Sequence, residues 1–91
     1  MNVKLFAFDN GTWVERGRGT LRLNDKNCDG VMTSRIVIRT VGSLRVVLNT
    51  KIWSGMTLNR ASDRSVRLTA LDPNGQLKIF LIQVFNFFFI I

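Results

Sequence analysis

One short segment of the sequence carries residue types that commonly bind other proteins. Residues 13–17 read Trp-Val-Glu-Arg-Gly, and Arg18 and Gly19 follow directly. A tryptophan can act as an aromatic anchor and a Glu-Arg pair can make charged contacts, since such residue types concentrate binding energy at interfaces. The segment is also compatible with a strand that has an edge tryptophan, a salt-bridging Glu-Arg pair and two glycines at a bulge or bend. On the segment alone, this structural interpretation is the better one.

Basic residues form the second group that could do chemistry. The 13 Lys and Arg outnumber the 6 Asp and Glu, which gives a net charge of +7. Several of them are predicted to lie on strand positions opposite the core: Arg18, Arg22, Arg35, Arg39, Arg45, Arg64, Arg67 and Lys78. Any one of these could simply keep a surface solvated. Together they predict a positive surface that attracts an anionic partner.

Catalysis and metal binding are disfavoured by the composition. The chain has no histidine and only six scattered carboxylates, so the usual general bases and imidazole ligands are missing. Cys28 is the only cysteine, which excludes an internal disulfide and a cysteine-rich zinc site and suits a reducing compartment. Its thiol lies beside Asp25, Lys26 and Asp29 in an expected loop, where an incidental exposed cysteine is the simpler interpretation. No secretory signal is visible at the N-terminus.

Nucleic acid and membranes are the other anionic partners to consider. A basic β-barrel could bind single-stranded nucleic acid, but the aromatic residues that would stack on bases are scarce, because Trp13 and Trp53 are the only tryptophans and tyrosine is absent. Single-strand binding is therefore kept as an alternative, and no DNA partner is expected. A phosphoinositide site would need a basic first loop, and residues 9–12 are not basic, so no membrane partner is expected. Asn49, Lys51 and Trp53 could line a site or simply end a strand.

The elements that must position these residues are β-strands. Apolar and polar residues alternate with a period of two, and no segment has convincing helical periodicity. The expected buried faces include Leu21 with Leu23, Ile36 with Ile38, the series at positions 44, 46 and 48, the series at 66, 68 and 70, and the series at 77, 79 and 81. The strands are expected near residues 3–8, 12–16, 18–24, 33–40, 44–50, 64–71 and 76–83, and the irregular stretch 53–63 could hold one more around 56–58.

Turn residues separate the expected strands and give the fold class. Glycine-containing turns are expected at residues 9–11, 29–30, 41–43 and 72–75, where Pro73 presets φ and Gly75 can adopt the left-handed conformation. The chain is therefore predicted to be all-β, a small antiparallel meander closed into a sandwich or barrel. Residues 1–83 are expected to form one domain that is incomplete at its C-terminal end, and residues 84–91 an apolar tail that replaces the element that would normally finish the fold.

A series of motifs in this order resembles the Ran-binding domain family, most closely the Ran-binding protein 3 type. The motifs are residues 4–6 (Lys-Leu-Phe), 13–23 (Trp-Val-Glu-Arg-Gly-Arg-Gly-Thr-Leu-Arg-Leu), 35–39 (Arg-Ile-Val-Ile-Arg), 44–53 (Leu-Arg-Val-Val-Leu-Asn-Thr-Lys-Ile-Trp) and 78–82 (Lys-Ile-Phe-Leu-Ile). The likeness covers roughly residues 3–83, and the ordered series is more specific than any single motif.

The resemblance implies a pleckstrin-homology-like antiparallel barrel of about seven strands and a non-catalytic adaptor. Such a domain binds the GTP-bound form of the small GTPase Ran in nucleocytoplasmic transport and requires no small-molecule cofactor. Members of the Ran-binding protein 3 type also resemble nuclear export cofactors, which assist an exportin that transports proteins with leucine-rich export signals. The expected location is nuclear, with shuttling to the cytoplasm. Carried over, the GTPase-binding residues are Trp13, Val14, Glu15, Arg16 and Gly17, and those that receive Ran's acidic C-terminal tail are Arg35, Arg39, Arg45 and Asn49.

Three departures from the family pattern are visible. Val14 stands where many members have lysine, which is expected to lower affinity for Ran. The arm that precedes the first strand in tighter binders has no counterpart, because the first strand begins near residue 3. The closing helix that covers one mouth of the barrel also has no counterpart after Gln83, so the product is expected to be truncated or alternatively terminated.

Overall fold

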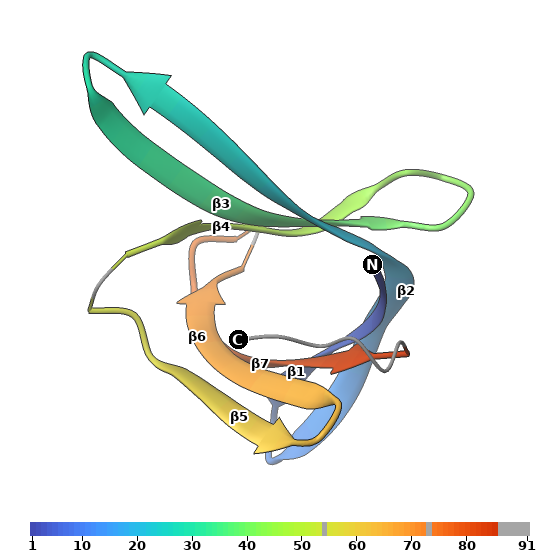
Figure 1. The fold of residues 1–91 in the computed structure, drawn as a ribbon. Helices are drawn as coiled ribbons and strands as arrows, with labels where there is room; N and C mark the ends of the chain where they lie inside the picture. The colour runs from blue at the N-terminus through green and yellow to red at the C-terminus, as the bar shows by residue number, and fades with distance from the viewer. Residues whose placement is uncertain (54, 73, 86–91) are drawn as a thin grey trace.

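The structure is a computed structural model that describes residues 1–53, 55–72 and 74–85 (Figure 1). Alternating apolar and polar residues produce strands throughout, and no helix occurs among these residues. The same residues therefore contain no helix that could span a lipid bilayer. The seven strands are β1 (Asn2–Asp9), β2 (Thr12–Cys28), β3 (Val31–Thr40), β4 (Val46–Ile52), β5 (Leu58–Ser62), β6 (Ser65–Leu71) and β7 (Leu77–Val84).

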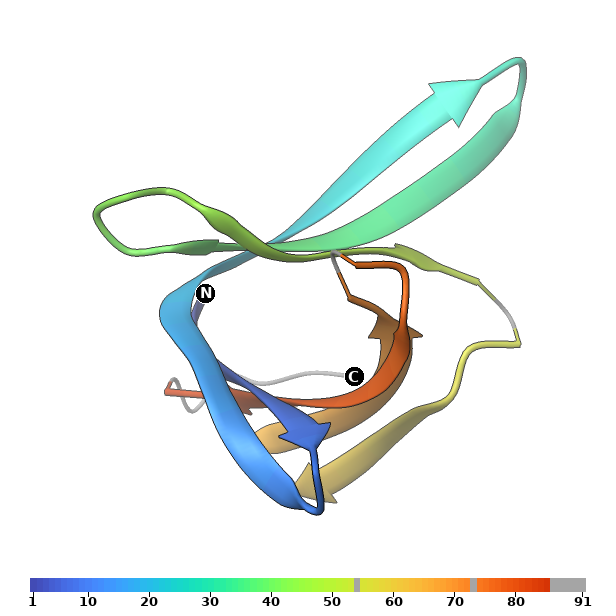
Figure 2. The same ribbon diagram turned by 180° about the vertical axis from the view of Figure 1, so that it is seen from behind.

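All seven strands form one antiparallel sheet with the order β4-β3-β2-β1-β7-β6-β5. It consists of two meanders, β1 to β4 and β5 to β7, which are joined where β1 pairs with β7. The sheet curls on itself, so that β3 and β4 face β1, β7 and β6 across the interior (Figures 1 and 2). The prediction of an all-β antiparallel barrel is confirmed, and β4 and β5 are the two edges along which it stays open.

Two expected strands are a single one in the structure. Residues 12–16 and 18–24 were expected to be separate, but β2 runs without a break from Thr12 to Cys28. A β-bulge makes this possible, because Leu5 pairs with Gly17 while Phe6 pairs with Glu15, so Arg16 is an extra residue. A bulge bends a strand and keeps its ladder. Cys28 is exposed at the end of β2, and Asp25 and Lys26 lie in this strand rather than in the expected loop.

The irregular stretch at residues 53–63 does contain a strand, although it begins later than expected. Strand β5 covers Leu58–Ser62 and pairs only with β6. All five of its residues are exposed, so this strand has no apolar face for a sequence pattern to reveal. The seven expected strands and the seven observed strands therefore agree in number, but differ in the undivided β2 and in the added β5.

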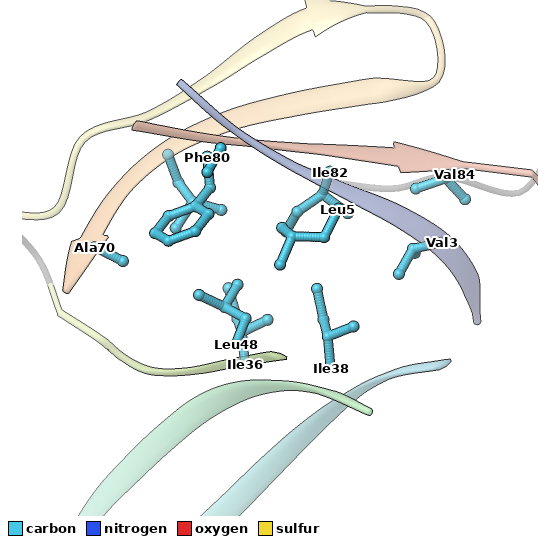
Figure 3. Packing of buried hydrophobic residues seen from close by; sticks show 11 residues of the cluster. Val3, Leu5, Ile36, Ile38, Leu48, Ala70, Phe80, Ile82 and Val84 are labelled. Carbon is cyan, nitrogen blue, oxygen red and sulfur yellow. The ribbon is translucent and has the colours of Figure 1, made fainter. Parts of the chain in front are cut away.

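The core lies between the two halves of the curled sheet. Leu5, Ile82 and Phe80 point from one side toward Ile36, Ile38 and Leu48 on the other (Figure 3). Buried residues also come from the ends of these strands and from β6: Val3, Ala7, Leu68, Ala70 and Val84. Buried faces expected for residues 36 with 38 and for 66, 68 and 70 are confirmed, since every one of these side chains is buried.

Three expected buried faces are wrong in part. In β7 the buried side chains are Phe80, Ile82 and Val84, whereas Leu77 and Ile79 are exposed. A continuous apolar run such as residues 79–82 does not reveal which of its two faces is the inner one. Leu44 precedes β4 and is exposed, and Val46 at the start of β4 is exposed as well. Only Leu48 of that series is buried in the core. Leu23 is also exposed, although its register partner Ile36 is buried. The β2–β3 hairpin to which it belongs extends beyond the barrel (Figure 1).

Tight turns connect the hairpins as their residues predict. Asn10 and Gly11 have φ values of 49° and 79°, and Asp29 and Gly30 have 51° and 81°. Paired left-handed residues of this kind make the two-residue turns that match the twist of antiparallel strands. Pro73 lies outside the described residues, as do residues 86–91 of the expected apolar tail. Val84, the first residue of that tail, ends β7 and is buried in the core.

The turn between β6 and β7 is organised by Asp72. Its carboxylate accepts hydrogen bonds of 2.9 Å from the backbone N–H groups of Asn74 and Gln76. Lys78 Nζ lies 3.3 Å from the Asp72 carboxylate and 3.6 Å from that of Asp9. The Gln76 hydrogen bond, together with those from Lys78 and Asn74, lowers the pKa of Asp72 below its usual value despite partial desolvation.

Gly19 is expected to tolerate no side chain. In Gly19→Ala the new Cβ would collide with the backbone carbonyl of Arg39, which belongs to the hydrogen-bonded partner strand and cannot retreat. We expect a loss of about 3 kcal/mol of unfolding free energy. Gly30→Ala is the control, because its Cβ would meet no atom within 4 Å and only the left-handed φ of 81° would cost about 1 kcal/mol. Urea denaturation measures both, and equal losses would contradict the collision.

Asp72→Asn is expected to lower stability at neutral pH and to matter less in acid. A carboxylate whose folded pKa is depressed stabilises the fold above its usual pKa of 3.8, and this contribution is lost as the pH falls through the folded value. Denaturation of the wild-type chain and of Asp72→Asn at pH 7 and below the usual pKa measures the difference between their unfolding free energies. We expect this difference to become smaller in acid. Asp63→Asn, in the exposed β5–β6 turn, is the control. A gap that stays constant with pH would rule out the charge as its cause.

Candidate partner-binding surface

The bulge in β2 determines which way the first candidate segment faces. Paired residues on neighbouring strands share one face, so Gly17 lies on the inner face with buried Leu5, and Glu15 lies on the outer face with Phe6. Without the extra residue Arg16, strict alternation would turn position 15 and position 13 inward. The bulge therefore places both Trp13 and Glu15 on the outside of the sheet.

Trp13 is an accessible aromatic side chain that packs against a second ring. Its register partner is Phe8, and the two rings meet edge to face with centroids 5.2 Å apart. The relative exposures of Trp13 and Phe8 are 39% and 42%, so neither ring is covered. Edge-to-face pairing holds the indole in one orientation, which lowers the entropy that a partner must remove on binding. The arrangement is suited to an aromatic anchor.

Glu15 and Arg16 are held by different ion pairs on opposite faces. Glu15 lies 3.2 Å from Lys4 Nζ on the outer face, with about half of its side chain exposed. Arg16 lies 3.5 Å from the Asp9 carboxylate and lines a cavity at one mouth of the barrel. Val14 pairs with the core residue Ala7 and so belongs to the inner face. The expected five-residue segment is thus split, and only Trp13 and Glu15 share a surface with each other.

The basic face is the outer side of β2, β3 and β4, formed by Arg22, Arg35, Arg39, Asn49 and Lys51. The register pairs Arg35 with Lys51 and Val37 with Asn49, opposite the side on which Ile36 and Ile38 are buried. Arg35 donates hydrogen bonds to the Asn49 side-chain oxygen at 2.7 Å and to its backbone carbonyl at 3.3 Å. From Thr20 to Lys51 alternation brings no carboxylate to this face, so its positive charge is not neutralised.

Two basic residues are not where the sequence placed them. Lys78 pairs with buried Ala70, which puts it on the inner face, where it bridges Asp9 and Asp72. Arg45 lines the mouth cavity of about 380 Å³ with Arg16 and Lys78, apart from the basic face. The irregular pairing between Ile38 and Arg39 adds a residue to the start of β4, so simple alternation does not predict the direction of Arg45.

Two contributors to the surface were not predicted from the sequence. Phe8 and Lys4 orient Trp13 and Glu15, and both follow from the register of the first hairpin. The two-residue turn at Asn10-Gly11 fixes Phe8 opposite Trp13 and could have been used to find it. Lys4 is opposite Arg18, and its contact with Glu15 depends on the bulge, which the glycines of this segment indicated. Arg18 in turn stacks its guanidinium 4.4 Å from the centre of the Phe85 ring.

The described residues hold no cluster of metal-ligating side chains. Glu15 forms an ion pair with Lys4, and Arg16 forms one with Asp9. The features that stand out are an exposed aromatic pair, an outward carboxylate and a separate positive face. These are means of recognition, and they suit a protein partner that has an acidic segment.

Comparisons with known proteins identify the family. A family model described as RanBP1 domain matches residues 1–85. Ran-binding protein 3 of Homo sapiens is 54% identical over 88 residues, which cover 91% of this chain and 16% of that protein. Ran-specific GTPase-activating protein 2 of Saccharomyces cerevisiae is 37% identical over 83 residues, covering 82% of this chain and 25% of that protein. The chain thus spans less than one fifth of the length of Ran-binding protein 3.

A solved structure shows the same fold. The Ran binding domain of the nuclear complex component Nup2 from Ashbya gossypii has a TM-score of 0.72 and 22% sequence identity, and the match covers 93% of this chain and 76% of that one. Its fold is pleckstrin-homology-like, as predicted here. Nothing in these similarities favours the nucleic-acid alternative. The resemblance noted in the sequence is confirmed, and this chain belongs to the RanBP1 domain family.

Proposed function

We propose that this chain is a non-catalytic adaptor that binds the GTP-bound form of Ran. The observation that carries the proposal is the outward pair Trp13 and Glu15, held by Phe8 and Lys4 at the first hairpin. Membership of the RanBP1 domain family and the similarity to Ran-binding protein 3 support Ran as the partner. The indole supplies apolar area and the carboxylate supplies a charge that selects a basic counterpart.

The basic face offers a physical basis for preferring one nucleotide state. In the proposed complex it receives the acidic C-terminal tail of Ran, with Arg35, Arg39 and Asn49 as the contacts. If the tail is free to dock only in the GTP state, a domain that holds the tail binds that state better and shifts the population toward it. Arg45 lies at the barrel mouth, so it contributes through its long-range charge rather than as a neighbour of Arg35.

The proposed role leaves the chemistry of GTP hydrolysis to Ran and its activator. Glu15 and Arg16, the charged residues of the proposed GTPase contact, are paired with Lys4 and Asp9. Paired in this way they fix geometry and charge rather than move a proton. Similarity to a protein named Ran-specific GTPase-activating protein 2 supports Ran as the GTPase that this chain binds. We assign this chain binding to Ran and no part in GTP hydrolysis.

The cellular setting belongs to the same proposal. A nuclear export cofactor would act in the nucleus and shuttle to the cytoplasm, together with an exportin that carries leucine-rich signals. The similarity to Ran-binding protein 3 supports this setting. Co-precipitation of such an exportin with the chain and GTP-bound Ran would test it, and capture that does not depend on Ran would contradict the cofactor role.

Glu15→Lys is expected to weaken capture of GTP-loaded Ran by about thirtyfold or more, since an interface hot spot is worth about 2 kcal/mol. Binding to GTP-loaded and GDP-loaded Ran is compared by pull-down and quantified by titration. Asp63→Lys makes the same charge change in a distant exposed turn and is the control. The double variant Lys4→Glu with Glu15→Lys reverses the ion pair without abolishing it, so the fold should be kept while binding stays lost. Wild-type binding by that double variant would contradict the proposal.

Arg35→Glu is expected to lower affinity for GTP-loaded Ran by about tenfold, because a charge-assisted contact at an interface is worth about 1.5 kcal/mol or more. The loss should shrink as salt is added, since exposed charges are screened. Removal of the acidic tail from Ran provides the matched control, since the variant and the wild-type chain should then bind equally. An Arg35→Glu effect of the same size on tailless Ran would show that the basic face does not hold the tail.

A further inference from the structure

The cavity at the mouth of the barrel combines charged side chains with an apolar wall. Its volume of about 380 Å³ lies within the range of small-molecule sites. Val46, Val47 and Phe80 supply its apolar surface. A smaller hollow of about 190 Å³ shares Val46 and Val47 with the cavity and is also lined by Leu48 and Leu71. The apolar wall therefore continues beyond the cavity itself.

Three cations line the cavity, and two of them are neutralised within the fold. Arg16 lies 3.5 Å from the carboxylate of Asp9, and Lys78 bridges Asp9 and Asp72. In the described part of the chain the guanidinium of Arg45 makes no hydrogen bond or ion pair. A free guanidinium presents a planar fork of donors that fits a carboxylate through two parallel hydrogen bonds. Arg45 is therefore the cation that remains available to an anion.

The carboxylate of Asp72 also lines the cavity, but its charge is compensated. One of its oxygens accepts hydrogen bonds of 2.9 Å from the backbone N–H groups of Asn74 and Gln76. The other oxygen lies 3.3 Å from Lys78 Nζ. An anion that approaches Arg45 therefore meets no uncompensated negative charge at this carboxylate.

The apolar wall can be reached because β4 is a free edge of the sheet. Val46 is 41% exposed at the start of this strand, and Leu71 of the adjoining hollow is 58% exposed. Phe80 is only 2% exposed, so its ring is fixed by the core. An apolar molecule placed here would remove exposed aliphatic surface from water and would leave the core packing unchanged.

We propose that the mouth cavity binds a small organic monocarboxylate with an aliphatic body, of the size of a medium-chain fatty acid. The carboxylate pairs with the guanidinium of Arg45, and the aliphatic chain packs on Val46 and Val47 toward Phe80. One unpaired cation matches one negative charge, so a head group with several phosphates is a poorer match. The inference goes beyond the proposed function, and neither requires the other.

The probes are octanoate, hexanoate and octanol, titrated into the full chain and followed by the shifts of its amide signals in NMR spectra. Octanoate should bind about tenfold more tightly than hexanoate, because two further methylene groups are buried. It should also bind about tenfold more tightly than octanol, because only the carboxylate makes charge-assisted hydrogen bonds. The shifted amides should be those of residues 45–48 and 74–78. Shifts centred on Arg22 and Arg35 instead would place the anion on the basic face and overturn the inference.

Arg45→Met removes the charge and keeps an unbranched side chain at an exposed position. Affinity for octanoate should fall about tenfold while affinity for octanol stays the same. Arg67→Met is the matched control, because it removes the same charge from the outer face of β6, between buried Val66 and Leu68. It should change octanoate binding by less than about twofold. An equal loss in both variants would show that net charge alone attracts the anion and would overturn the site.

Val46→Thr tests the apolar wall without changing the size or branching of the side chain. The preference for octanoate over hexanoate should fall from about tenfold to about threefold, because a hydroxyl replaces one methyl group along the aliphatic chain. The melting temperature without ligand is measured alongside and should change little, since Val46 is exposed. An unchanged preference for the longer chain would show that the chain does not lie on β4 and would overturn the inference.

Two further comparisons separate this site from other assignments. Inositol trisphosphate that binds more tightly than octanoate at the same amides would assign the cavity to a polyphosphate and overturn the inference. Capture of GTP-loaded Ran by a chain that binds no octanoate would refute the cavity site and leave the adaptor role standing. Octanoate binding that depends on Arg45, without capture of Ran, would support the cavity site and refute Ran as the partner.

Discussion

The bulge at Arg16 is the feature on which the candidate surface depends. One extra residue in β2 opposite the step from Leu5 to Phe6 reverses the faces of all positions before it, so Trp13 and Glu15 point outward while Gly17 stays inward. The same residue leaves the outer face and joins Asp9 at the mouth of the barrel. Side chains alternate between the two faces of a sheet. A register shift of one residue therefore moves every side chain of the shifted segment to the opposite face.

The length of β2 connects the two surfaces. Its first residues include Trp13 of the aromatic pair and the outward Glu15. After Gly19 the same strand contributes Arg22 to the basic face. Gly19 allows this continuity, since its missing side chain makes room for the carbonyl of Arg39 on the neighbouring strand. The strand therefore sets the spacing between an apolar contact and a charged one, and a partner that engages both must match that spacing.

The ionic groups of the chain are divided between structure and recognition. Asp9, Arg16, Asp72 and Lys78 form a connected set at the barrel mouth, where Lys78 is shared by two carboxylates and is largely buried. This set neutralises itself and holds the β6–β7 turn against the first hairpin. The basic face has no carboxylate of its own, and its charge remains available to a partner. Net charge alone does not reveal this division, because both groups add to the same total.

The sequence by itself determined the all-β class, the positions of the tight turns, the buried faces of β3 and β6 and the membership suggested by the ordered motifs. These depend on local alternation, on glycines at left-handed positions and on the order of residue types, all of which are present in the chain as written. Tertiary structure alone decided the undivided β2, the exposed β5, the inner face of β7, the separation of Arg45 from Arg35 and the placement of Lys78 inside. Each of these depends on register or on a partner strand distant in sequence, and a local pattern contains no information on which neighbour a strand will meet.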